Sequence, residues 1–241
     1  MLLVFNWKSN PKTRIEAQKL AQTVLESEAK LPQTEARLRI QCVIAPSFAH
    51  LDVVAHMLKG TSVLLGVQDI GLPSLTGEVS GDMLRDLGVT YVIIGHSERR
   101  YVLGESDAFI NEKMRAALRA GIIPIVCVGE REKVDAKRAI QESLNQLSLA
   151  IEGIVSENFV VAYEPVWAIG GDKEVDPTYV SEVIAGIQKY RGAPTLYGGS
   201  VNCENISSLV QSGGKDGFLV GSAGLRKESV VCLIDTINNI Q

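Results

Sequence analysis

Eight short apolar runs alternate with eight amphipathic stretches along this chain, and that alternation limits its possible folds more than any other feature. The runs are almost continuously apolar and rich in β-branched residues, which is typical of strands covered on both faces. The stretches between them carry apolar residues at helical spacing. The predicted strands are residues 2–5, 40–45, 63–67, 91–94, 122–128, 159–162, 194–197 and 217–220. The predicted helices are residues 13–29, 48–58, 81–87, 107–120, 133–151, 178–190, 204–211 and 228–240.

Strict alternation of strand and helix predicts parallel strands joined by helical crossovers. Eight such units spread evenly over 241 residues favour a closed α/β barrel, the (β/α)₈ architecture, over an open doubly wound sheet. No linker or low-complexity segment divides the sequence, so we expect one domain over residues 1–241. In such a barrel, functional side chains gather just after the strands, at one end.

Charge and composition argue against several classes of protein. The net charge of −4 gives no sign of nucleic-acid binding. No stretch approaches the roughly 18 apolar residues of a membrane span, and the first residues lack the basic region of a signal peptide, so we expect a cytoplasmic protein. The four cysteines, Cys42, Cys127, Cys203 and Cys232, form no CxxC pair, which argues against a zinc site or a disulfide framework and fits a reducing compartment.

The segment 91–100 joins a predicted buried strand to a dense polar cluster. After the apolar residues 91–94, the chain breaks at Gly95 into His96, Ser97, Glu98 and two arginines. Because ligands bind at the carboxyl ends of parallel strands, His96 and Glu98 are candidate site residues. The alternative is a structural polar turn in which Glu98 and the arginines form ion pairs.

The histidines do not indicate a metal site. His96 and Glu98 match half of the zinc-deaminase signature, but the P-C-x-x-C that completes it is absent from the sequence. His50 and His56 lie in the predicted helix 48–58, and we expect both on its surface.

Glu164 stands at the end of the sixth predicted strand, directly before Pro165. Proline fixes the backbone, so we expect it to prevent a helix there and to keep the carboxylate at the mouth of the barrel. Val166, Trp167 and Ile169 give the carboxylate partly apolar surroundings, which suit a general base. The alternative is a glutamate held in a structural salt bridge.

Lys8 follows the first predicted strand, two residues after Asn6, and we expect both side chains on one face of the emerging strand. A lysine facing the mouth of a barrel is costly to bury unless it meets an anion. The alternative is a solvated lysine at the edge of a loop. Glycine-bearing turns follow the last three strands and could present N–H groups to a phosphate, although turns of this kind often need glycine for their geometry alone.

Six motifs together resemble the triosephosphate isomerase family, and they occur in that family's order from the first strand to the last. Each motif is moderately specific, whereas the ordered set is highly specific and covers essentially the whole chain. The motifs are NWK (6–8), GHSERR (95–100), CVGE (127–130), YEPVWAIG (163–170), YGGS (197–200) and DGFLVG (216–221).

The resemblance implies a TIM barrel that interconverts dihydroxyacetone phosphate and glyceraldehyde 3-phosphate through an enediolate, with no cofactor. It implies that Glu164 is the base and that His96 is a neutral electrophile. A helix beginning at His96 would disfavour added positive charge on the ring. The resemblance further implies that Lys8 supplies positive charge and that Asn6 positions the substrate oxygens.

The resemblance also implies a phosphate site, supporting residues, a closing lid and a partner. The lid is segment 165–171, and the partner is a second copy of this chain, docked through the loop from Asp69 to Glu78. The phosphate contacts would be Gly170, Ser200, Gly221 and Ser222, and the supporting residues Glu98, Ser97 and Cys127.

The sequence departs from the family's pattern at several positions. Phe5 and Ser9 replace a usual glycine and methionine beside Lys8, and Ser222 replaces a second glycine. Residues 172–175, at the end of the lid, differ from the usual small and hydroxylated hinge, and the loop after the third strand is shorter than usual. Two alternatives are a different phosphate-handling barrel enzyme and a non-catalytic phosphate-binding barrel. The joint presence of Lys8, His96 and Glu164 argues against both.

Overall fold

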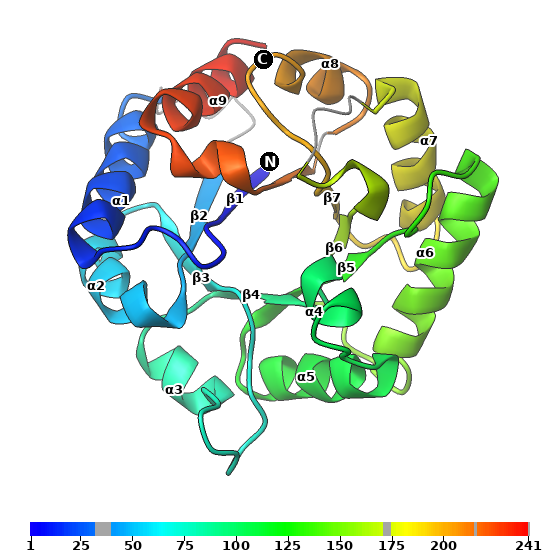
Figure 1. Cartoon of the computed structure of the whole chain (residues 1–241), viewed down its shortest axis with the longest axis horizontal. Helices are drawn as coiled ribbons and strands as arrows, with labels where there is room; N and C mark the ends of the chain where they lie inside the picture. The colour runs from blue at the N-terminus through cyan, green and yellow to red at the C-terminus, as the bar shows by residue number, and fades with distance from the viewer. Residues whose placement is uncertain (32–39, 171–174, 215, 241) are drawn as a thin grey trace.

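The computed structural model describes residues 1–31, 40–170, 175–214 and 216–240. Eight parallel strands form a closed barrel in the order of the sequence, and helices surround it (Figure 1). The barrel closes because β1 pairs with β8 as well as with β2, with Leu2 opposite Gly217. A Cβ at Gly217 would lie 1.8 Å from the Leu2 carbonyl oxygen, so glycine permits this approach. The prediction of a (β/α)₈ barrel is confirmed.

The strands and helices lie close to their predicted positions. Within the described ranges, no helix combines the length and apolar character needed to cross a membrane. The strands are β1 (Leu2–Asn6), β2 (Gln41–Ala45), β3 (Leu64–Val67), β4 (Tyr91–Ile94), β5 (Ile123–Val128), β6 (Val160–Tyr163), β7 (Thr195–Tyr197) and β8 (Gly217–Val220). The helices are α1 (Arg14–Glu28), α2 (Phe48–Leu58), α3 (Gly81–Asp86), α4 (Ser97–Tyr101), α5 (Asp107–Arg119), α6 (Ala136–Ala150), α7 (Pro177–Gln188), α8 (Ile206–Gln211) and α9 (Lys227–Ile240), with 3₁₀ turns η1 (Val166–Ala168) and η2 (Ser222–Leu225).

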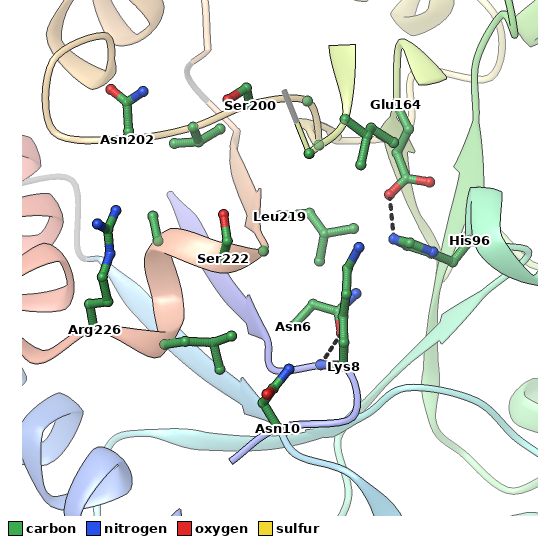
Figure 2. A pocket seen from close by; sticks show the side chains of 18 residues that line it. Asn6, Lys8, Asn10, His96, Glu164, Ser200, Asn202, Leu219, Ser222 and Arg226 are labelled. Carbon is green, nitrogen blue, oxygen red and sulfur yellow. Dashed lines mark hydrogen bonds and ion pairs between the residues drawn. The ribbon is translucent and has the colours of Figure 1, made fainter. Parts of the chain in front are cut away.

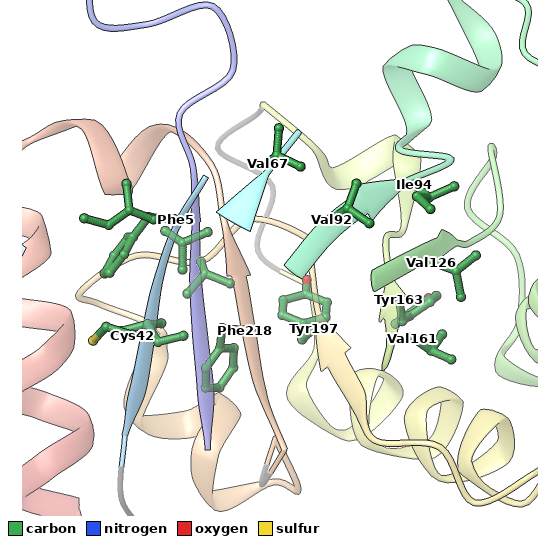
Figure 3. Packing of buried hydrophobic residues seen from close by; sticks show 14 of the residues in the cluster. Phe5, Cys42, Val67, Val92, Ile94, Val126, Val161, Tyr163, Tyr197 and Phe218 are labelled. Atoms are coloured by element: carbon green, nitrogen blue, oxygen red, sulfur yellow. The ribbon is translucent and has the colours of Figure 1, made fainter. Parts of the chain in front are cut away.

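Side chains alternate between two buried layers along each strand. The outer layer packs between the strands and the helices and includes Phe5 and Tyr163 (Figure 3). The inner layer fills the barrel and includes Val4 and Ala162. Because the period is two residues, Asn6 and Glu164 continue the inner face beyond their neighbours Val4 and Ala162. The pattern that builds the core therefore also points these two polar side chains into the mouth of the barrel.

Three helix predictions need correction. The predicted helix 133–151 begins only at Ala136, because the Asp135 side chain accepts the N–H of Arg138 and caps the helix. The predicted helix 204–211 begins at Ile206. The expectation that Pro165 prevents a helix was wrong, since η1 starts directly after it. Proline is tolerated at a helix start because its missing N–H would have no partner there.

The surface prediction for the histidines was right for His56 and wrong for His50. His56 is exposed. His50 is buried, with Nε2 2.9 Å from the carbonyl oxygen of Pro11. The helical period places residue 50 on the inner side of α2, so position in a helix did not mean exposure.

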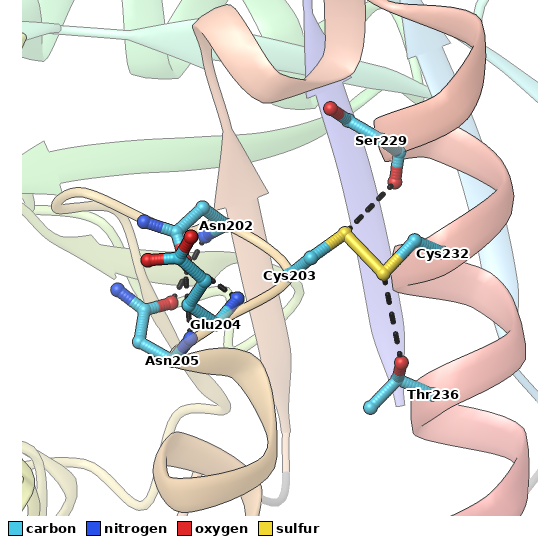
Figure 4. The surroundings of a disulfide bond; sticks show 7 residues. All are labelled: Asn202, Cys203, Glu204, Asn205, Ser229, Cys232 and Thr236. Carbon is cyan, nitrogen blue, oxygen red and sulfur yellow. Dashed lines mark hydrogen bonds between the residues drawn. A yellow bond between two sulfur atoms is a disulfide. The ribbon is translucent and has the colours of Figure 1, made fainter.

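A disulfide joins Cys203 to Cys232, although the sequence analysis argued against a disulfide framework (Figure 4). Cys203 lies in the loop between β7 and α8, and Cys232 lies on α9. The two are 29 residues apart in sequence, but β7 and β8 are neighbours in the barrel, and α8 packs against α9. Their Cα atoms are 6.0 Å apart, within the usual span of a disulfide. Sequence spacing alone carried no sign of this contact.

Thiol labelling should give three different counts under three conditions. Burial raises the pKa of Cys42 to about 12 and raises the pKa of Cys127 well above its ordinary value. At pH 8 neither is a thiolate, so iodoacetamide should leave the folded protein unlabelled. The unfolded protein should take two labels without reductant and four after reduction, measured by intact mass. Four labels on unfolded, unreduced protein would contradict the disulfide.

Candidate active site

One cavity, of about 330 Å³, opens at the carboxyl ends of the strands. Figure 2 shows Glu164 and His96 on one side of it and Ser200, Asn202 and Ser222 on the other. The cavity brings together side chains from the loops after several strands, as expected for a barrel of this type. Eight of the predicted site residues line it: Asn6, Lys8, His96, Glu164, Gly170, Ser200, Gly221 and Ser222.

The Glu164 carboxylate is held in a fixed orientation at the wall of this pocket. Its side chain is almost fully buried, and Oε2 accepts the backbone N–H of Ser97 at 3.1 Å. Oε1 lies 3.2 Å from Nε2 of His96. A Cβ at Gly129 would lie 1.9 Å from the Glu164 carbonyl oxygen, so a glycine there lets the ends of β5 and β6 approach. The carboxylate is thus buried beside a histidine, with room in the pocket for a ligand.

His96 occupies the N-cap of α4, directly after the end of β4 at Ile94 and the turn at Gly95. Its Nδ1 accepts the backbone N–H of Glu98 at 3.2 Å. A nitrogen that accepts a hydrogen bond carries no proton, so these contacts favour the neutral tautomer with its proton on Nε2. That N–H faces Glu164 and the pocket.

Lys8 reaches the pocket by a route the sequence did not predict. We expected Asn6 and Lys8 on one face of a strand, but β1 ends at Asn6, and Lys8 has a left-handed φ of 53°. Such a backbone costs of order 1–3 kcal/mol for a residue with a Cβ and needs support. The Gln68 amide supplies it by donating to the carbonyl oxygens of Lys8 (2.8 Å) and Ala45 (2.9 Å). The Asn6 side chain also accepts the Lys8 N–H at 3.1 Å.

The ammonium of Lys8 is paired with a carboxylate at the rim. Its Nζ donates to Oε1 of Glu98 at 2.6 Å. Burial by itself would raise the pKa of Glu98, but the hydrogen bond and charge of Lys8 lower it overall. Glu98 is therefore a carboxylate at neutral pH. The structure thus places Glu98, named above as a supporting residue, in direct contact with Lys8.

Short polar loops form the side of the pocket opposite Glu164. Asn205 braces one of them, because its side chain donates to the Ser200 carbonyl oxygen and accepts the Asn202 N–H, both at 2.9 Å. Gly221 precedes η2, and Ser222 is its first residue and is exposed. Gly170 has a φ of 71°, which glycine adopts without strain. Of the predicted lid and hinge, residues 171–174 lie outside the described residues.

Three predicted supporting residues do not belong to the lining of the pocket. Ser97 and Glu98 hold Glu164, His96 and Lys8 through the contacts above. Cys127 is buried on β5, and Arg100 Nη2 donates to its carbonyl oxygen at 3.2 Å. These three residues shape the site without lining the cavity.

Glu130 holds the segment that follows Glu164, and the sequence analysis missed that role. This fully buried carboxylate accepts three hydrogen bonds on Oε1, from Tyr163 (3.0 Å), Trp167 (2.8 Å) and Tyr179 (3.0 Å). Trp167 belongs to η1, which leads to Gly170 in the pocket. An acidic residue at the end of a buried strand was the only signal in the sequence.

Arg226 was also missed. It follows η2 and lines the pocket near Asn202 and Ser222 (Figure 2). A cation just after the glycine turn of the last strand was the signal available in the sequence.

Across the described ranges, no group of three or more metal-ligating side chains is arranged to hold a metal ion.

Comparison with known proteins identifies the family. The family model described as triosephosphate isomerase matches residues 1–237. That match spans the barrel from its first strand to its last helix, and it includes every residue of the pocket. The chain belongs to the triosephosphate isomerase family. It is therefore an enzyme of the aldose–ketose isomerase type.

Bacterial relatives carry the same family name over nearly their full length. A triosephosphate isomerase of Synechococcus sp. (strain JA-2-3B'a(2-13)) is 38% identical, over 98% of this chain and 96% of the relative. One of Symbiobacterium thermophilum is 41% identical, over 96% of this chain and 94% of the relative. One of Thermoanaerobacter pseudethanolicus is 39% identical, over 93% of this chain and 94% of the relative. The resemblance found in the six sequence motifs is confirmed.

Proposed function

We propose that this protein interconverts dihydroxyacetone phosphate and D-glyceraldehyde 3-phosphate without a cofactor, as a single barrel domain over residues 1–241. The observation that carries the proposal is the meeting of Glu164, His96 and Lys8 in one pocket. A buried carboxylate, a neutral imidazole N–H and an ammonium group are the parts needed to move a proton beside a carbonyl.

Glu164 removes a proton from the carbon next to the substrate carbonyl, leaving an enediolate. Charge then develops on oxygen, and the Nε2–H of His96 donates to that oxygen. Lys8 adds positive charge there, and Asn6 positions the oxygens. Glu164 returns the proton to the neighbouring carbon, while His96 moves a proton between the two oxygens. These donors are already in place where the charge develops, so they need no reorganisation during the reaction, and they lower the free energy of the transition state.

The phosphate end of the substrate lies against the opposite wall in this proposal. Hydroxyls and backbone N–H groups of Gly170, Ser200, Gly221 and Ser222 hold it. Such neutral donors suit an anion because they can all point at its oxygens. A cytoplasmic location completes the proposal, because phosphorylated trioses are charged and do not cross membranes unaided.

A coupled assay tests this function directly. Purified protein is given glyceraldehyde 3-phosphate, and dihydroxyacetone phosphate is followed over time. We expect turnover with no added metal or nucleotide cofactor and with EDTA present. Folded protein that converts neither triose phosphate would contradict the proposed function.

We further propose a homodimer that docks through the Asp69–Glu78 loop. Leu75 at its tip is half exposed, and Val102 and Leu103 after α4 are more so. Large apolar side chains left in water on functional loops indicate a contact surface. This loop is shorter than the family's usual dimer-forming loop, so we expect it to bury a smaller area against the second subunit.

Light scattering should give twice the 26.1 kDa chain mass at micromolar concentration. The double substitution Leu75→Asp with Val102→Asp should shift the protein to monomer, because it places charges in an apolar contact. The control is Val155→Asp, since Val155 is 90% exposed and lies before β6, at the other end of the barrel. A wild-type protein of monomer mass would contradict the dimer.

A further inference from the structure

Arg226 is the one cation lining the described part of the pocket whose side chain has no partner there. The other, Lys8, is already paired with Glu98. The structure records no hydrogen bond or ion pair for the Arg226 guanidinium within residues 1–31, 40–170, 175–214 and 216–240. A guanidinium is charged at all relevant pH values and presents five donors in a fixed fork. It is therefore free to meet an anion that enters the pocket.

The position of Arg226 is set by the backbone around it. It directly follows η2, whose first residue is Ser222, and its carbonyl oxygen accepts the N–H of Val230 in the first turn of α9. Figure 2 shows its side chain on the same side of the pocket as Asn202 and Ser222, away from Glu164 and His96. The cation thus stands at the end of the pocket where no proton transfer takes place.

The charges of the pocket favour a cation at its phosphate end. The proposed phosphate contacts are all neutral, while Glu164 places a negative charge in the same cavity and the whole chain carries −4. The neutral donors can hold the phosphate oxygens but do not offset the charge of a dianion, and the ammonium of Lys8 is already paired with Glu98. A guanidinium adds a positive charge and binds phosphate oxygens in pairs.

We propose that Arg226 is a specificity-determining residue, whose guanidinium pairs with the phosphate of the substrate and makes the pocket prefer a phosphorylated triose to a neutral one. This inference rests on the proposed function, since it takes the substrate to be a triose phosphate. It assigns Arg226 to substrate binding and leaves proton transfer to Glu164 and His96.

The test compares Arg226→Gln, Arg226→Lys and Lys227→Gln. Lys227 is the matched control, because it is the next residue, is also an exposed cation and lines a separate groove beside α1. Arg226→Gln should raise KM for glyceraldehyde 3-phosphate and the inhibition constant of inorganic phosphate by roughly tenfold, the scale of one charge-assisted hydrogen bond. Its effect on kcat should be much smaller. Arg226→Lys should recover part of the loss, and Lys227→Gln should behave as wild type.

A second readout separates charge recognition from a structural defect. The preference for glyceraldehyde 3-phosphate over glyceraldehyde, as a ratio of kcat/KM values, should fall about tenfold in Arg226→Gln. An unchanged ratio, or a phosphate inhibition constant equal to that of Lys227→Gln, would overturn the proposal. Calorimetry with inorganic phosphate needs no turnover. An inactive wild type would therefore reject the proposed function, while the calorimetric comparison of Arg226→Gln with Lys227→Gln would still decide whether Arg226 binds phosphate.

Discussion

Glu164→Gln is expected to reduce kcat by roughly 10²- to 10⁴-fold, the usual contribution of a positioned general base. The amide has the same shape as the carboxylate but cannot take up the substrate's proton. Its oxygen can still accept the N–H of Ser97, and its NH₂ group then faces Nε2 of His96. Stability should change little, and KM should move less than kcat, because the lost interaction exists only in the transition state.

Steady-state kinetics in both directions measures this effect. The matched control is Glu157→Gln, which makes the same chemical change at an exposed glutamate before β6, at the far end of the barrel. That control should retain wild-type kcat and KM. A Glu164→Gln enzyme with kcat within a few-fold of wild type would mean that another group is the base.

Lys113→Met should destabilise the protein by about 3–5 kcal/mol, the usual cost of stranding buried charge. Lys113 is 1% exposed, and its ammonium contacts both carboxylate oxygens of Asp69 (2.8 and 2.7 Å) and Oε1 of Glu105 (2.5 Å). Arg99 completes the cluster, with contacts of 2.8 Å to Asp69 and 2.6 Å to Glu105. Two cations balance two carboxylates, and removal of Lys113 leaves Arg99 alone between both of them, so that one negative charge of the cluster has no balancing cation.

Urea unfolding tests the cluster, with the midpoint expected to fall and the slope to stay constant. Adding Asp69→Asn to Lys113→Met should recover part of the loss, because it removes the stranded charge. The control is Arg138→Gln, which breaks the exposed pair with Glu142 and should cost less than about 1 kcal/mol. Equal effects of Lys113→Met and Arg138→Gln would show that the buried cluster adds no stability.

The barrel could be predicted because its pattern is local. Near-continuous apolar runs and helical periodicity both act over a few residues, and their strict alternation leaves few topologies. The period of two in a strand also carries Asn6 and Glu164 to the mouth, so part of the site followed from the rule that built the core. Helix starts were less certain, since a single cap such as Asp135 moves the boundary by several residues.

The remaining features depend on contacts between distant parts of the chain. The backbone of Lys8 is held by Gln68, which is 60 residues away. Glu130 gathers three donors from segments 33 to 49 residues downstream. The partner of Cys203 lies on the last helix. Only closure of the barrel brings these groups together, so neither the spacing of residues nor their periodicity in the sequence could predict these contacts.

Proton NMR of turnover in D₂O tests the central claim most directly. Glyceraldehyde 3-phosphate is converted by the purified enzyme, and the dihydroxyacetone phosphate formed is examined for deuterium at the carbon that receives the proton. If Glu164 carries the proton through an enediolate, it exchanges with solvent, and the product should contain deuterium. Product formed without any deuterium would indicate direct transfer of hydrogen between the carbons, and it would contradict the assignment of Glu164 as a base.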